Sequence, residues 1–218
     1  MNISALAIFI VSTTIHLYAS LKQNKKLRNY TKPLILASLL WWYVLVCTAP
    51  SKTMIAALLF SWLGDVLLIG PGVKYFTIGG IAFMISHAFF IISYNQFVTF
   101  ANICPAVIIV LAVIFFIAVC IIFSKLKAHL PKPLFYPMAL YLYINGTMNC
   151  FAVFRAISNP CTASIITCIG AFLFFISDTS LFFVRFKKDS RLKTHFLVML
   201  TYSIGEFLIV LGMIPNLF

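Results

Sequence analysis

The chain has 218 residues, of which 63% are hydrophobic and 9% are charged, whereas about a quarter of the residues in an ordinary soluble domain are charged. This composition excludes a soluble globular domain. The 16 Lys and Arg residues against 4 Asp and Glu give a formal net charge of +12, which in a polar chain would suggest nucleic acid. The long apolar runs exclude that partner.

Eight apolar segments follow one another along the chain, each near the length of about 20 residues that a helix needs to cross a bilayer. They span residues 3–21, 33–48, 53–69, 74–94, 102–124, 134–157, 161–184 and 194–217. The first segment lacks a basic leader, so we expect it to be retained rather than cleaved. Because the backbone must satisfy its own hydrogen bonds inside a bilayer, we expect an all-α integral membrane protein, with residues 1–218 forming one domain, an eight-helix transmembrane bundle.

The cations indicate how this bundle is oriented. All but two of the 16 Lys and Arg residues fall in the linkers after the first, third, fifth and seventh segments, and the other linkers are assigned only Lys52 and Arg155. Short cytoplasmic loops carry an excess of Lys and Arg. The pattern therefore predicts a multi-pass protein with non-cytoplasmic N- and C-termini, located in the inner membrane if the source is bacterial.

Short repeated strings suggest an internal duplication. The tripeptides Lys32-Pro33-Leu34 and Lys132-Pro133-Leu134 open the second and sixth segments, and an aspartate follows a small residue in the third segment (Asp65) and in the seventh (Asp178). Both matches are offset by four helices, as a parallel repeat of helices 1–4 onto 5–8 would be. Strings this short also match by chance, so both explanations stay open.

Three of the four acidic residues lie within apolar segments. Asp65 and Asp178 are predicted at similar depth, and Glu206 lies deeper, whereas Asp189 lies among linker cations and is interpreted as a solvated charge. An aspartate near the centre of a spanning helix costs about 2.5–3.5 kcal/mol on insertion scales. Hydrogen bonds to Ser, Tyr or Asn would make the pair structural, but the matched depth of Asp65 and Asp178 favours a functional pair.

Histidine and cysteine give little support for a metal site, because no ligand-type spacing such as HxxxH or CxxC occurs. His87 ends a series on one helical face, with Phe76, Gly79 and Phe83 before it. Its imidazole is either hydrogen-bonded within the bundle or positions water or substrate. We therefore predict no metal.

Polar side chains on the sixth and eighth segments predict a central cavity. Tyr141 and Asn145 share one face of the sixth helix, and Tyr202 and Glu206 share one face of the eighth. Asn145 and Glu206 both need polar partners when they are buried. We expect these four residues and His87 to line a cavity that also contains the two aspartates.

Five motifs in order resemble the YhhN family of membrane proteins. They are Lys-Pro-Leu at 32–34, Gly64-Asp65 with the leucines after it, Phe76-x-x-Gly79-x-x-x-Phe83-x-x-x-His87, Ser177-Asp178-x-x-Leu181, and Tyr202-x-x-Gly205-Glu206-x-Leu208-Ile209. The resemblance extends from Lys32 to Ile209. It departs from the family at Glu206, where glutamine is usual, so this position either only hydrogen-bonds or titrates.

Characterised YhhN proteins are lysoplasmalogenases, so the resemblance implies hydrolysis of the vinyl ether bond of a lysoplasmalogen. The products would be a fatty aldehyde and a glycerophospho-alcohol, such as glycerophosphoethanolamine or glycerophosphocholine. The implied partners are a lysophospholipid and the bilayer, with no cofactor.

Vinyl ether hydrolysis needs an acid, a base and a negative field, which two carboxyl groups in a weakly polar cavity can supply. One of Asp65 and Asp178 would be the general acid, and the other would activate water. The sequence does not distinguish which. Lys32, Lys74 and Lys132 would meet the phosphate, or they would simply follow the positive-inside rule.

Three other functions use some of the same features. An intramembrane aspartyl protease also has two membrane aspartates, but Trp62 stands where its Gly-x-Gly-Asp motif has the first glycine, and no Pro-Ala-Leu tripeptide occurs. A proton-coupled or lipid transporter can use paired acids as a relay. A zinc-dependent lipid hydrolase is disfavoured by the absent histidine spacing.

Overall fold

Eight α-helices account for most of the computed structural model, which describes residues 3–187 and 195–215. They are α1 (Ile3–Leu21), α2 (Lys25–Val46), α3 (Lys52–Leu67), α4 (Gly72–Asn95), α5 (Pro105–Leu126), α6 (Phe135–Ser158), α7 (Thr162–Phe186) and α8 (His195–Gly212). Single 3-10 turns form η1 (Phe100–Asn102), η2 (Lys127–His129) and η3 (Lys132–Leu134). No β-strand occurs in the described residues, so the all-α expectation is confirmed. Asp189 and its neighbours Lys188, Arg191 and Lys193 lie outside the described residues.

Five of these helices, α1, α4, α5, α7 and α8, are long and apolar enough to cross a membrane. The apolar surface of α5 supports this, because Ile109, Val113, Phe116 and Ile117 are each about half exposed. Contiguous apolar surface of this kind is rare on soluble monomers and indicates a lipid or protein contact. The remaining helices carry more polar residues or, like α3 with 16 residues, are shorter.

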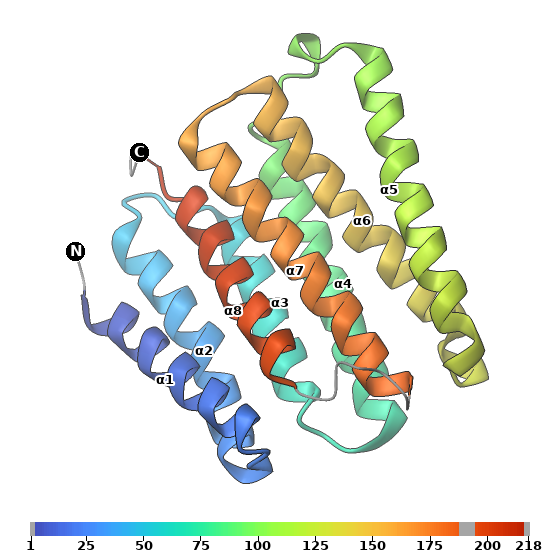
Figure 1. The fold of residues 1–218 in the computed structure, drawn as a ribbon. Coiled ribbons are helices and arrows are strands. Elements are labelled where there is room, and N and C mark those ends of the chain that lie inside the picture. Colours follow the sequence, from blue (N-terminus) through green and yellow to red (C-terminus); the bar gives the residue numbers. More distant parts are fainter. Residues whose placement is uncertain (1–2, 188–194, 216–218) are drawn as a thin grey trace.

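The helices pack side by side as hairpins that follow the chain (Figure 1). α1 packs on α2, α3 on α4, and α7 on α8, and these are the most extensive contacts in the molecule. Contacts between α4 and α6 and between α1 and α8 join the hairpins, while α5 lies at one edge against α6. This order places α3, α4, α7 and α8 around the centre of the bundle.

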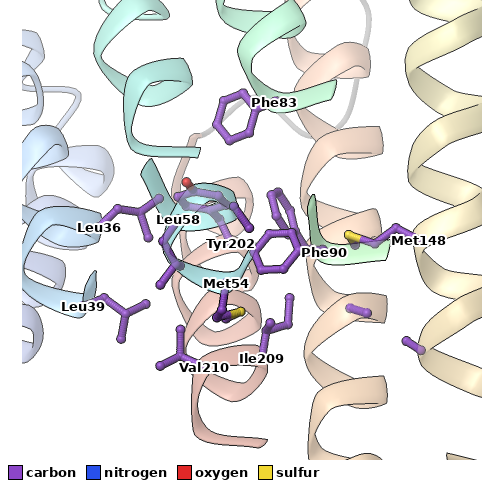
Figure 2. Packing of buried hydrophobic residues seen from close by; sticks show 14 of the residues in the cluster. Leu36, Leu39, Met54, Leu58, Phe83, Phe90, Met148, Tyr202, Ile209 and Val210 are labelled. Carbon is purple, nitrogen blue, oxygen red and sulfur yellow. The ribbon is translucent and has the colours of Figure 1, made fainter. Parts of the chain in front are cut away.

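Large apolar side chains fill that centre (Figure 2). Leu36 of α2, Leu58 of α3, Phe90 of α4 and Ile209 of α8 are fully buried members of one cluster. Lipid tails are as apolar as leucine, so in a bilayer such a core is stabilised by van der Waals packing rather than by removal of surface from water. Close fit therefore matters more here than hydrophobicity alone.

Small residues allow α7 and α8 to cross with their backbones in near contact. A Cβ atom added at Gly170 would lie 2.7 Å from the carbonyl oxygen of Gly205, and one added at Gly205 would lie 2.9 Å from the carbonyl oxygen of Gly170. Close to this crossing, the Ser177 hydroxyl donates to the carbonyl oxygen of Val198 at 2.8 Å. The crossing fixes the helix that carries Asp178 against the helix that carries Tyr202.

The prediction that Lys32-Pro33-Leu34 opens the second helix is wrong. α2 begins at Lys25, where the Asn24 side chain accepts from the backbone amide of Leu27 at 3.1 Å, so Pro33 lies inside the helix. Lys and Arg are good helix formers, and a capped basic stretch extends the helix beyond its apolar run. The matching Lys132-Pro133-Leu134 forms η3 before α6, so the two tripeptides occupy different structural positions.

The assignment of Arg155 to a linker is also wrong. Arg155 lies in α6 and is only 5% exposed. Its guanidinium donates to the carbonyl oxygen of Gly212 at 2.9 Å and to the Thr167 hydroxyl at 2.7 Å. A cation is favourable beside the free carbonyl groups at a helix C-terminus. Arg155 thus caps α8, which ends at Gly212 instead of residue 217.

Candidate active site

A cavity of about 600 Å³ is lined by residues of α1, α2, α3, α4, α7 and α8, and Asp65 and Asp178 both lie in its wall. Tyr141 of α6 and Tyr202 of α8 also lie in its wall. The apolar cluster of Figure 2 reaches this wall at Phe83 and Tyr202, whose ring centroids are 6.2 Å apart. Each aspartate is almost completely buried, with 2% of Asp65 and 5% of Asp178 exposed.

Asp65 is held by donors at both of its carboxyl oxygens. The Lys32 ammonium lies 3.2 Å from Oδ1, and the Tyr202 hydroxyl donates to Oδ2 at 2.7 Å. The residue before it, Gly64, lies so close to α4 that an added Cβ would be 2.5 Å from the Phe83 ring. Asp65 thus has a charge-assisted contact at one carboxyl oxygen and a phenol donor at the other.

Asp178 is held at one oxygen only. Its Oδ2 accepts from the Tyr141 hydroxyl at 2.6 Å and from the Asn145 amide at 2.7 Å, and His87 Nε2 lies 3.2 Å away. No side chain among residues 3–187 and 195–215 hydrogen-bonds the other oxygen, Oδ1. This oxygen is free to carry a proton or to meet a ligand in the cavity.

His87 and Asn145 contact Asp178 but do not line the cavity. Both are fully buried. Nε2 of His87 faces Asp178, and its buried Nδ1 has no hydrogen-bond partner in the described structure. The ring also packs edge-on against Phe174 at 4.9 Å between centroids. The structure thus places His87 as a support for Asp178.

Glu206 differs from the other predicted cavity residues. It is fully buried, does not line the cavity, and neither carboxyl oxygen has a hydrogen-bond partner within the described chain. The expectation that a central cavity would supply its polar partners is not met. Ser61 lies near its carboxyl group, and the Ser61 hydroxyl hydrogen-bonds that of Ser86 at 2.7 Å.

The mouth of the cavity is cationic. Lys25, Arg28 and Lys32 of α2 and Arg185 of α7 line it. The three α2 cations are spaced i, i+3 and i+7, which places them on one helical face. That spacing is visible in the sequence, and it was obscured by the interpretation of residues 22–32 as a linker.

The three lysines expected near a phosphate are placed differently from one another. Lys32 lines the cavity and pairs with Asp65, whereas Lys74 and Lys132 are exposed and lie outside its wall. Arg28 is a further candidate, because its buried Nε has no hydrogen-bond partner among the described residues. Arg185 packs over the Phe76 ring at 5.5 Å and donates to the Gly72 carbonyl oxygen at 3.4 Å.

The described side chains include no group of three or more His, Cys, Asp or Glu residues that would hold a metal ion. The carboxyl groups of both aspartates contact other side chains: an ammonium, two phenols, an amide and an imidazole. This arrangement supplies proton donors and acceptors at two carboxyl groups that share one cavity.

A sequence model of the YhhN family matches residues 27–213, most of the chain. The chain belongs to the YhhN family. Neither curated proteins nor solved structures provide a match. The matched range contains both aspartates and every side chain that hydrogen-bonds them, and it contains most of the cavity wall, whereas His16, Ser20, Gln23 and Lys25 of the wall precede it. YhhN proteins are lysoplasmalogenase-like, which gives the cavity a chemical class to be tested.

Proposed function

We propose that this YhhN protein hydrolyses the vinyl ether bond of lysoplasmalogens, with Asp178 as general acid and Asp65 as general base. The observation that carries the proposal is the unequal environment of two carboxyl groups in one cavity. Asp65 faces an ammonium and a phenol, while Asp178 keeps Oδ1 free of partners among the described residues. Carboxyl groups in unlike environments divide acid and base roles in this way.

In the first step, Asp178 donates the proton on Oδ1 to the outer alkene carbon of the vinyl ether. The carbon that bears the ether oxygen becomes an oxocarbenium centre, and the negative charge of Asp65 stabilises it. Water then adds to this carbon while Asp65 accepts the proton that water loses. Each Asp65 oxygen retains a lone pair for that proton, because a carboxylate oxygen accepts more than one hydrogen bond.

The resulting hemiacetal collapses in the second step. Its hydroxyl proton returns to Asp178, the bond between carbon and glycerol oxygen breaks, and Asp65 gives its proton to that oxygen. Both carboxyl groups return to their starting states, and no electron acceptor or cofactor is consumed. The products are a fatty aldehyde and a glycerophospho-alcohol.

The membrane setting is part of the same proposal. Eight helices cross the membrane, which is the inner membrane if the source is bacterial. Both termini lie outside the cytoplasm, and the cationic mouth faces the cytoplasm. The clustering of Lys25, Arg28, Lys32 and Arg185 at one end supports this orientation. A lysophospholipid would then present its phosphate to these cations while its chain remains in the apolar phase.

The direct test is aldehyde release by purified protein in detergent or nanodiscs. An alkenyl lysophospholipid should yield aldehyde, whereas the matched alkyl and acyl lysophospholipids should yield none, since only the alkenyl compound can form the oxocarbenium ion by protonation. Activity should persist after exhaustive chelation. Absence of aldehyde from folded protein would contradict the proposal, and peptide cleavage or vesicle uptake in its place would favour the protease or the transporter.

A further inference from the structure

A shallow apolar groove lies between α4 and α6, beside the cavity. Its free volume is about 30 Å³, and its lining includes Gly80, Ile81 and Met84 of α4 and Pro137 and Met138 of α6. Ile81 is 43% exposed, so the groove faces the outer surface of the bundle. Apart from a threonine and a tyrosine, every residue of its wall is apolar.

The groove adjoins the cavity. Four residues line both of them: Phe76, Gly80, Tyr141 and Phe182. Tyr141 also donates to Asp178 at 2.6 Å, so one wall residue touches the groove, the cavity and the carboxyl group. Tyr141 thus lies beside both the groove and Asp178.

Gly80 keeps the junction between the two spaces open. A Cβ atom added there would have no other atom within 4 Å, whereas one added at Gly79 would lie 3.1 Å from Leu68, and one added at Gly64 would lie 2.5 Å from Phe83. Gly64 and Gly79 are explained by close helix packing. Packing does not explain Gly80, since the space above it is empty.

We propose that the hydrocarbon chain of a single-chain phospholipid lies in this α4–α6 groove while its phosphate lies at the cationic mouth. The two adjoining spaces match the two ends of such a lipid: Arg28 and Arg185 line the cavity, and hydrocarbon and methionine side chains line the groove. This inference rests on the proposed function. It specifies where the chain lies and places the first chain carbons beside Tyr141 and Asp178.

The groove offers a contact surface to the proximal part of a chain. From Phe76 to Met84, α4 rises by about 12 Å, and the groove follows this stretch of the helix. Met84 and Met138 are flexible side chains that adapt to different occupants. The aldehyde product would leave sideways into the bilayer, and the water-soluble product would leave through the mouth.

The first experiment fills the junction. Gly80→Leu adds a side chain into empty space and should leave the fold intact, as thermal unfolding in detergent would verify. We expect the ratio of kcat/KM for a decenyl over a propenyl lysoplasmalogen to fall by at least about tenfold, since only the longer chain extends along the groove and apolar pockets discriminate chains at this level. Gly80→Ala should give a smaller fall. Ala112→Leu, on the exposed face of α5, is the matched control and should leave the ratio unchanged.

An unchanged ratio in folded Gly80→Leu protein would overturn the groove assignment while leaving vinyl ether hydrolysis standing. A second measurement does not depend on turnover. A non-hydrolysable alkyl lysophosphatidylcholine with a diazirine on one of the first chain carbons should label wild-type peptides from α4 and α6. Labelling confined to other helices would also overturn the assignment. If no substrate gave aldehyde but α4 and α6 were labelled, the proposed reaction would fail and the lipid site would stand.

Discussion

Replacing Asp178 by asparagine separates its proton from its packing, because the structure uses only one of its two oxygens. Oδ2 accepts from Tyr141, Asn145 and His87. In Asp178→Asn, the amide oxygen can take the place of Oδ2 and keep these donors, and the NH2 group then occupies the free Oδ1 position. We expect the fold to be retained, since no buried donor loses its acceptor.

The catalytic effect of Asp178→Asn should be large. Removing a general acid typically costs about 10²–10⁴-fold in rate. We expect kcat for aldehyde release to fall by at least that factor, while KM changes little. Unfolding temperature in detergent serves as the check on folding. The same chemical change at Asp189, in the cation-rich segment after α7, is the matched control and should be near neutral.

Asp65→Asn should behave differently, since both oxygens of Asp65 accept from donors. The amide would place its NH2 group against either the Lys32 ammonium or the Tyr202 hydroxyl, and the ion pair would be lost. We expect a loss of activity like that of Asp178→Asn and, in addition, a loss of about 1–3 kcal/mol of stability. Because both residues act on one transition state, the double variant should lose much less than the product of the single losses.

Near-normal aldehyde release by folded Asp178→Asn protein would refute the acid assignment and return this residue to a packing role. Multiplicative losses in the double variant would refute the idea that the two carboxyl groups act on one step. An equally stable Asp65→Asn variant would show that the pair with Lys32 is energetically unimportant.

Three further predictions concern the mouth, the helix crossing and the topology. Arg28→Gln and Arg185→Gln should each raise KM by about tenfold with little change in kcat. Each substitution removes a charge-assisted contact to phosphate that is equal in the ground and transition states. Steady-state kinetics would measure both constants, and a fall in kcat with unchanged KM would contradict the prediction. Gly205→Ala should lower the stability in detergent by about 1–3 kcal/mol, since its Cβ would meet backbone atoms at 2.9 Å, whereas Gly80→Ala should be near neutral. A reporter fused after Lys127 should be cytoplasmic and one at the C-terminal end should not; a cytoplasmic C-terminus would contradict the proposed orientation.

The helices were predictable because apolar runs in this chain are long and their breaks are marked by Pro, Gly and Asn. The boundary of α2 was not, because residues 25–32 are polar and yet helical. Hydropathy reports where a helix meets lipid and does not report where the helix begins. Asn24 was the available signal, since asparagine is a strong N-cap residue.

The aspartates were predictable as site candidates because acidic residues inside apolar helices are few and costly. Their partners were only partly predictable. His87 lies 91 residues from Asp178 in the chain, and Tyr202 lies 137 residues from Asp65. Helical spacing shows which residues share a face and does not show which face meets another. Arg155 was misassigned for a similar reason, because its role depends on the end of a helix that lies far along the chain.

The two aspartates occur in similar sequence settings, but the surrounding helices make them unlike. Lys32 is held 3.2 Å from Asp65, and a phosphate bound by the same ammonium would compete with that carboxylate. Arg28 lies one helical turn earlier on the same face of α2 and has an unpartnered Nε within the described structure. Arg28 is therefore better placed than Lys32 to bind a phosphate. In the proposed reaction, the two cations on one face of α2 would then have different partners: Arg28 would contact the headgroup, and Lys32 would stay paired with the carboxyl group of Asp65.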